Sequence, residues 1–116
     1  VGQQFEDLDR FPHLVLDTSH LGVSGIGLSD AYARYRDKIV HFHLSNNAGK
    51  GWDSHLSVDE GVLEIGALLE EIARTGYRGT MALELDLRRV MDDAAELEEV
   101  LRRNREFCEE RLQVRA

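Results

Sequence analysis

The sequence predicts an α/β fold in which parallel strands alternate with helices. Short apolar runs and amphipathic stretches of helical period follow one another three times along the chain. The runs are almost continuously apolar rather than alternating, which is typical of parallel strands covered by helices. Two architectures fit this pattern: a small open α/β sheet, or a segment of a (β/α) barrel.

The first predicted strand is the apolar run 14–16, which is closed by polar residues. Apolar runs bounded by turn residues indicate buried strands. The segment 21–27 contains three glycines and predicts a loop. Residues 31–37 then predict a short helix, with Ser29 or Asp30 as its N-cap.

The second predicted strand covers residues 39–44, which are β-branched and aromatic and include two histidines. A polar segment follows over residues 45–57, and loops of this length in small domains are often functional. Residues 62–74 place apolar side chains at helical spacing, and Gly76 supplies a natural stop for that helix.

The third predicted strand covers residues 80–85, and a last helix begins at Asp92 or Asp93. Residues 92–111 carry eight acidic side chains and four arginines, and so supply −4 of the net charge of −8. A charged helix of this kind is typical of a solvated face, so the net charge says little about a functional site.

Composition excludes several classes of protein. With 116 residues, 42% of them hydrophobic and 31% charged, the chain fits one folded domain rather than a disordered segment. No apolar run approaches the roughly 18 residues of a membrane helix, and no signal peptide opens the chain. A lone cysteine, Cys108, favours a reducing compartment, so we expect a cytoplasmic protein. The acidic balance argues against a nucleic-acid partner.

Ionisable side chains occur where each predicted strand ends. Asp17 and His20 follow the first strand, His41 and His43 lie in the second, and Glu84 lies near the end of the third. The carboxyl ends of parallel strands share one side of an α/β fold, where ligands bind. Carboxylate and imidazole groups together suit a divalent ion such as Mn, Zn, Co or Mg. The sequence therefore predicts a metal site.

The candidate ligands differ in how strongly the sequence supports them. His41 and His43 share one face of their strand, and only His43 is near enough to the carboxyl end to reach a metal. Glu84 lies in an apolar run, where a carboxylate is costly unless it is paired or metal-bound. Asp17 could be a ligand or a cap after its strand.

Other polar groups leave alternatives open. Asp53 and His55 could form a second ligand pair, contact a substrate or belong to a solvated loop. Asp86 and Arg88, just past the third strand, could contact a substrate or face water.

Four segments resemble motifs of the xylose isomerase-like TIM barrels. Residues 16–20 resemble the D-T-x-H segment of that superfamily, and residues 41–47 its H-x-H-L-x-D-N strand, with Asn46 where the family often has Asp. Residues 53–61 are similar to its D-x-H-L-x-x-G-x-G loop, and residues 76–84 to its G-Y-x-G…L-E element. The superfamily includes sugar phosphate isomerases and epimerases and the endonuclease IV group of apurinic-site nucleases.

The resemblance implies a fold of eight βα units, of which this chain matches the last three. We therefore expect residues 1–116 to form a single partial domain, the C-terminal portion of a TIM barrel. The chain would be a fragment lacking an N-terminal half, or a piece that assembles with other copies. A further glutamate ligand of the family, from an earlier strand, has no counterpart here.

The resemblance also implies roles for individual residues. Asp17, His43 and Glu84 would bind a catalytic divalent metal, and Glu84 and His20 would take part in catalysis. In the nuclease group a further zinc would be bound by His20 together with Asp53 and His55. The residues expected to contact substrate are His20, Asn47, Lys50, Trp52, Asp53 and His55.

Three functional hypotheses follow. The first is a metal-dependent sugar or sugar-phosphate isomerase or epimerase, which transfers a proton next to a carbonyl of a small-molecule substrate. The second is an endonuclease IV-like zinc phosphodiesterase acting on apurinic DNA. The third is an inactive barrel fragment.

Overall fold

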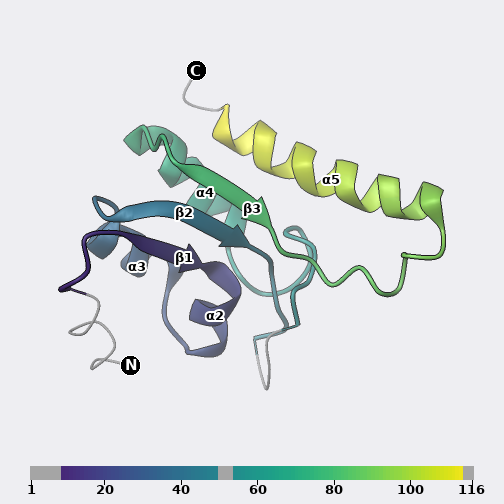
Figure 1. The fold of residues 1–116 in the computed structure, drawn as a ribbon, viewed down its shortest axis with the longest axis horizontal. Coiled ribbons are helices and arrows are strands. Elements are labelled where there is room, and N and C mark those ends of the chain that lie inside the picture. Colours follow the sequence, from purple (N-terminus) through teal and green to yellow (C-terminus); the bar gives the residue numbers. More distant parts are fainter. Residues whose placement is uncertain (1–8, 50–53, 114–116) are drawn as a thin grey trace.

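Three parallel strands form the centre of the structure. The computed structural model describes residues 9–49 and 54–113. The elements, in chain order, are β1 (Leu14–Asp17), α2 (Thr18–Val23), α3 (Leu28–Tyr35), β2 (Ile39–Leu44), α4 (Ile65–Thr75), β3 (Thr80–Leu83) and α5 (Ala94–Leu112), as labelled in Figure 1.

The sheet has the order β1-β2-β3, and all three arrows point the same way in Figure 1. Both strand pairs are parallel, with Asp17 opposite His43 and His43 opposite Ala82. This arrangement confirms the predicted parallel α/β fold and places the carboxyl ends of the strands along one edge.

The hydrophobic core lies between one face of the sheet and the helices α3 and α4, which are behind the sheet in Figure 1. Phe42, at the centre of β2, is fully buried, and its ring lies edge-on to Tyr77 at a centroid distance of 4.9 Å. Leu68 and Leu69 of α4 are also fully buried in this layer. Because side chains alternate along a strand, the histidines of β2 lie on the opposite face.

That opposite face carries the side chains of interest. Val15, His41 and Thr80 form one row across the three strands, and Val15 is 52% exposed. In a (β/α) barrel this face of the sheet is turned toward the barrel interior. The metal ligands predicted from the sequence lie on the same face, nearer the carboxyl ends.

The last helix, α5, packs against α4 and holds the long loop between β2 and α4. Asn104 is fully buried; its Oδ1 accepts a hydrogen bond from the Val58 N–H at 2.7 Å, and its Nδ2 donates to Ser57 Oγ at 3.0 Å. Arg103 adds an ion pair to Asp59, with Nε and Oδ2 2.9 Å apart. The buried side of this helix thus includes one polar residue that holds a loop.

Cys108, on the same buried side of α5, is a free thiol. Burial raises its pKa to about 11, so the reactive thiolate is scarce at neutral pH. Cys108 therefore acts as a small buried side chain that packs against the core. Of the helices in the described part of the chain, none is both long enough and apolar enough to cross a membrane.

The structure differs from the prediction at the beginning of two helices. A helix, α2, replaces the first part of the predicted loop, because it begins directly after β1 with Asp17 as its N-cap. Helix α3 begins at Leu28, three residues earlier than predicted, and its cap is Gly27 rather than Ser29 or Asp30. Leu28 is buried, and packing its side chain extends the helix to this position.

One further helix start and one strand end differ from the prediction. Helix α4 begins at Ile65 rather than at residue 62, because the preceding turn holds Gly61 at a φ of 113°. Strand β3 ends at Leu83 rather than at residue 85, although the Glu84 N–H still donates to Leu44 O at 3.0 Å. These shifts leave the order of the predicted strands unchanged.

Replacing Asn104 tests the link between α5 and the loop. Asn104→Ala leaves the buried Val58 N–H without its acceptor, so we expect the free energy of unfolding to fall by about 1–3 kcal/mol. Urea denaturation measures the change. Arg105→Ala, at an exposed position on the same helix, should change the free energy of unfolding by less than about 0.5 kcal/mol. Equal losses in the two variants would contradict this role of Asn104.

Candidate metal centre

Three ionisable side chains meet at the carboxyl-end edge of the sheet. Asp17 is the last residue of β1, His43 is the next-to-last of β2, and Glu84 directly follows β3. Asp17 and His43 are register partners, so they share one face of the sheet. The parallel pairing therefore brings together residues that are far apart in the sequence.

The distances define one compact cluster. His43 Nδ1 lies 3.3 Å from Glu84 Oε1 and 3.6 Å from Asp17 Oδ2. One potential ligand atom of each residue lies within 4.8 Å of the other two, and no second group of three such residues occurs within residues 9–49 and 54–113. The side chains are partly accessible, at 34% for His43, 17% for Asp17 and 40% for Glu84.

This geometry fits a divalent ion. Two ligand atoms that each lie about 2.1 Å from an ion are roughly 3.0–3.6 Å apart when the angle at the ion is about 90–120°. The distances from His43 to both carboxylates fall in or beside that range. Two carboxylates and one imidazole form a donor set that Mn, Zn, Co or Mg accepts.

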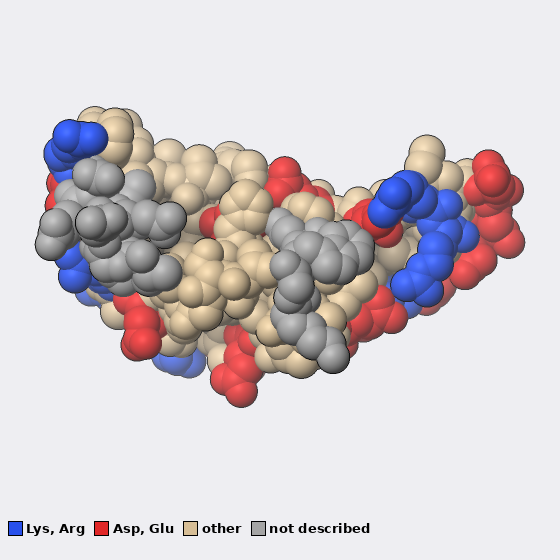
Figure 2. Space-filling view, turned by 90° about the horizontal axis from the view of Figure 1, so that it is seen from below, with Lys and Arg blue, Asp and Glu red and all other residues tan. Residues whose placement is uncertain are grey.

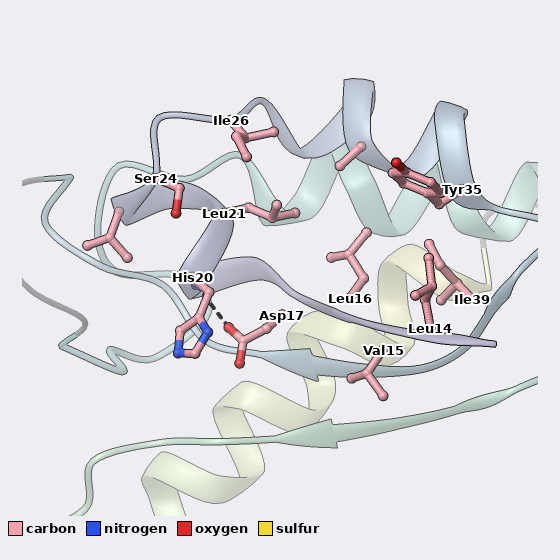
Figure 3. A pocket seen from close by; sticks show the side chains of 12 residues that line it. Leu14, Val15, Leu16, Asp17, His20, Leu21, Ser24, Ile26, Tyr35 and Ile39 are labelled. Carbon is pink, nitrogen blue, oxygen red and sulfur yellow. Dashed lines mark hydrogen bonds between the residues drawn. The ribbon is translucent and has the colours of Figure 1, made fainter. Parts of the chain in front are cut away.

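Asp17 serves two purposes at once. Its Oδ1 accepts a hydrogen bond from the His20 N–H at 2.9 Å, drawn as a dashed line in Figure 3, and this bond caps α2. Its Oδ2 faces His43. The cap bond holds one carboxylate oxygen and leaves the other directed at His43. Asp17 can therefore be both the helix cap and a candidate ligand.

His41 lies one row behind the cluster. Its Nδ1 is 2.6 Å from Thr80 Oγ1, and its ring lies edge-on to that of His43 at a centroid distance of 4.9 Å. His41 is therefore hydrogen-bonded within the sheet face, as expected, and it limits the rotation of the His43 ring.

His20 lies near the cluster but is not part of it. It is exposed, and it stands with Asp17 at one end of an apolar groove of about 340 Å³ between β1, α2 and α3 (Figure 3). This position at the rim is compatible with the expected contact to substrate. Within the described residues, His20 and His55 do not join a three-ligand group.

His55 has an unusual backbone for a residue other than glycine, with a φ of 48°. Its Nδ1 lies 3.2 Å from Ser45 Oγ at the end of β2, and it lines a hollow together with Glu84. Three other expected contacts, Lys50, Trp52 and Asp53, lie outside the described residues. The second zinc set expected from His20, Asp53 and His55 is therefore only partly described.

Asn47 lies differently from what we expected of a substrate contact. It is fully buried; its Nδ2 donates to Ser19 O at 2.9 Å, and its Oδ1 accepts from the Gly49 N–H at 2.8 Å. With both ends of its amide directed at the backbone, Asn47 holds the loop after β2 against α2. We assign it this structural role.

Asn46 is also buried, and both ends of its side-chain amide are hydrogen-bonded. Its Nδ2 donates to Val58 O at 3.1 Å and to Leu63 O at 3.2 Å, and its Oδ1 accepts from the Leu63 N–H at 2.8 Å. A carboxylate cannot donate to those two carbonyls. The side chain closes the long loop rather than adding charge to the metal cluster.

Sequence reasoning missed Thr18, which joins the ends of two strands. Its Oγ1 donates to Ser45 O at 2.7 Å and accepts from the Ser45 N–H at 3.1 Å. Thr18 is fully buried. A hydroxyl directly after a strand-ending aspartate was the available signal, but its partner lies 27 positions away.

The described architecture matches a known family. The family model described as "Xylose isomerase-like TIM barrel" matches residues 7–111. The chain belongs to this family. Its three parallel βα units are therefore part of a TIM barrel, as the sequence motifs predicted.

Similar proteins agree with this membership. Uncharacterized proteins of Mycobacterium bovis and Mycobacterium tuberculosis are each 29% identical over 82 residues, or 70% of this chain and 29% of the relative. An uncharacterized protein of Mycobacterium leprae is 28% identical over 96 residues, or 83% of this chain and 34% of the relative. The chain thus matches about a third of the length of these relatives.

A solved structure has the same fold. The crystal structure of a D-tagatose 3-epimerase-like protein superposes with a TM-score of 0.61 at 23% sequence identity. The match covers 86% of this chain and 37% of that one. The likeness shows that the two chains share a fold over the matched part.

Exchanging the Asn46 amide for an acid tests how the loop is closed. Asn46→Asp would place a carboxylate oxygen against two backbone carbonyls, so we expect a loss of about 3 kcal/mol in the free energy of unfolding. Urea denaturation measures this loss of stability. Gln113→Glu adds the same charge at an exposed position and should change stability by less than about 1 kcal/mol. If Asn46→Asp left the free energy of unfolding almost unchanged, this account of the loop would be wrong.

Proposed function

We propose that the protein carrying this chain is a metal-dependent sugar or sugar-phosphate isomerase or epimerase. The observation that carries the proposal is the convergence of Asp17, His43 and Glu84 at the carboxyl-end rim of the sheet. Active sites of TIM barrels lie at this rim. Membership of the xylose isomerase-like family supports the same reaction class.

Asp17, His43 and Glu84 would hold one divalent ion, with Mn, Zn, Co and Mg as candidates. When bound, such an ion supplies Lewis-acid polarisation of a substrate carbonyl and its neighbouring hydroxyl. Asp17 presents Oδ2 in a fixed direction because its Oδ1 is held by the cap of α2. His43 presents Nδ1 toward both carboxylates.

Glu84 is the candidate for proton transfer. Its side chain is 40% exposed at the rim, with Oε1 3.3 Å from His43 Nδ1, so a substrate could reach it. Glu84 would take the proton from the carbon next to the carbonyl and return it to the product. His20, exposed beside Asp17, would hold a substrate hydroxyl in place.

The substrate class is supported by the fold neighbour. The solved structure that resembles this chain is described as a D-tagatose 3-epimerase-like protein, which makes a ketose the first substrate to test. The nuclease alternative requires a second zinc set of His20, Asp53 and His55, of which Asp53 lies outside the described residues.

Asp17 variants test metal binding without disturbing α2. Asn caps a helix about as well as Asp, so Asp17→Asn should keep the fold while weakening Mn²⁺ binding by about tenfold to a hundredfold. Isothermal titration gives the affinity and the stoichiometry. Asp30→Asn, at an exposed position of α3, is the control and should bind Mn²⁺ normally. An unchanged affinity, or several ions per chain with cleavage of apurinic DNA, would speak against the isomerase.

Glu84→Gln tests proton transfer. We expect exchange of the carbon-bound hydrogen of a ketohexose with solvent deuterium to slow by at least about a hundredfold, because the amide cannot take the proton. Proton NMR in D₂O follows the exchange in the full protein carrying this chain. Glu98→Gln, on the exposed face of α5, should exchange at the parent rate. Undiminished exchange in Glu84→Gln would exclude Glu84 as the base.

A further inference from the structure

A hollow lies beyond the end of β3, next to the candidate metal centre. It has a volume of about 550 Å³ and is lined by Ser54 and His55 on one side and by residues 83–86 and Arg88 on the other. A second hollow of about 510 Å³ shares Ser54 and Arg88 and adds Arg89. Because Glu84 lines the first hollow, a molecule held at the metal centre could extend into it.

The two walls of the hollow are joined by the backbone. The Asp86 N–H donates to His55 O at 2.9 Å, which fixes the segment after β3 against the loop after β2. On the other side of Asp86, the Arg88 N–H donates to Asp86 Oδ1 at 3.2 Å. The side chains that line the hollow therefore start from defined positions.

Arg88 is held in one orientation by its neighbour. Its Nε lies 2.9 Å from Asp86 Oδ1, and its Nη2 lies 2.5 Å from Asp86 Oδ2. These two hydrogen bonds hold the guanidinium of Arg88 against the Asp86 carboxylate. The bonds occupy one edge of the guanidinium and leave the Nη1 hydrogens for another acceptor, while the side chain is 79% exposed.

Two further groups have no hydrogen-bond or ion-pair partner among residues 9–49 and 54–113. The Oγ of Ser54 is buried and makes no hydrogen bond within the described part of the chain. Buried hydroxyls are normally hydrogen-bonded, so this one calls for an acceptor. Arg89 is exposed and forms no ion pair with a described residue. Over the two hollows, Arg88 and Arg89 balance the carboxylates of Asp86 and Glu84, and Arg89 lies in the hollow that Glu84 does not line. In Figure 2, basic and acidic side chains lie side by side at the right-hand end of the molecule.

We propose that this hollow is a subsite for a phosphate-like oxyanion on the substrate, with Arg88, Arg89 and Ser54 as donors. Arginine binds phosphate and carboxylate oxygens through charge-assisted hydrogen bonds, and a hydroxyl donor adds to them. The inference rests on the proposed function, because Glu84 joins the hollow to the metal centre. Such a subsite would select a phosphorylated or acidic sugar over a neutral one.

Direct binding of inorganic phosphate tests the subsite without requiring catalysis. In the full chain with saturating Mn²⁺, Arg88→Gln/Arg89→Gln should weaken phosphate binding by about tenfold to a hundredfold in isothermal titration. Arg78→Gln, at the opposite end of β3, is the matched control and should change affinity less than about twofold. Acetate titrated in parallel distinguishes a phosphate site from a carboxylate site by which anion binds more tightly.

Ser54→Ala separates a binding role from a structural one. It should weaken phosphate binding by about threefold or more, yet leave the anion-free chain as stable as the parent or more so, because an unpaired buried hydroxyl is removed. A merely structural serine would lose stability and leave phosphate affinity unchanged. That result would remove Ser54 from the subsite.

Kinetics connect the subsite to the reaction. Arg88→Gln/Arg89→Gln should raise KM for a ketose phosphate by about tenfold or more and leave KM for the neutral ketose unchanged. Phosphate affinity that is absent from the parent, or equal in parent and double variant, would overturn the subsite. If the arginine-dependent binding is found but no sugar is turned over, the proposed reaction fails while the subsite stands.

Discussion

The parallel pairing of β2 with both of its neighbours is the constraint on which the rest of the structure depends. The register sets Asp17 opposite His43 and His43 opposite Ala82, so that Glu84, two residues later, reaches the same edge. Because strand side chains alternate, a slip of one residue would send His43 into the apolar layer around Phe42. One face of the sheet is buried under helices, and the need to keep its apolar side chains there fixes the register. This register brings the candidate ligands together.

Buried polar contacts build the rim above this sheet. Thr18 ties the end of β1 to Ser45 after β2, Asn46 closes the long loop, and Asn104 of α5 holds that loop from outside. Each of these side chains is almost fully buried, where an unpaired polar group would be costly. The rim is thus positioned by hydrogen bonds, while the layer beneath it is positioned by apolar packing.

The two regions at the rim differ in chemistry in a way that suits one elongated substrate. Asp17, His43 and Glu84 offer anionic and imidazole donors for a cation, whereas Arg88 and Arg89 beyond β3 offer donors for an anion. Glu84 borders both regions. Family membership supports a sugar isomerase or epimerase, and the charged groups beyond β3 favour an acidic or phosphorylated form of the sugar.

The sequence by itself determined the three strands, their parallel arrangement and the family, because apolar runs and strand-end motifs are local features. It also placed Asp17, His43 and Glu84 at strand ends, which in a parallel sheet are neighbours. Only the tertiary structure decided that Asn46 and Asn47 point inward, that α2 starts on the Asp17 carboxylate, and that Ser54 and Arg88 share a hollow. These outcomes depend on hydrogen bonds and packing between segments distant in the chain, which no local period encodes.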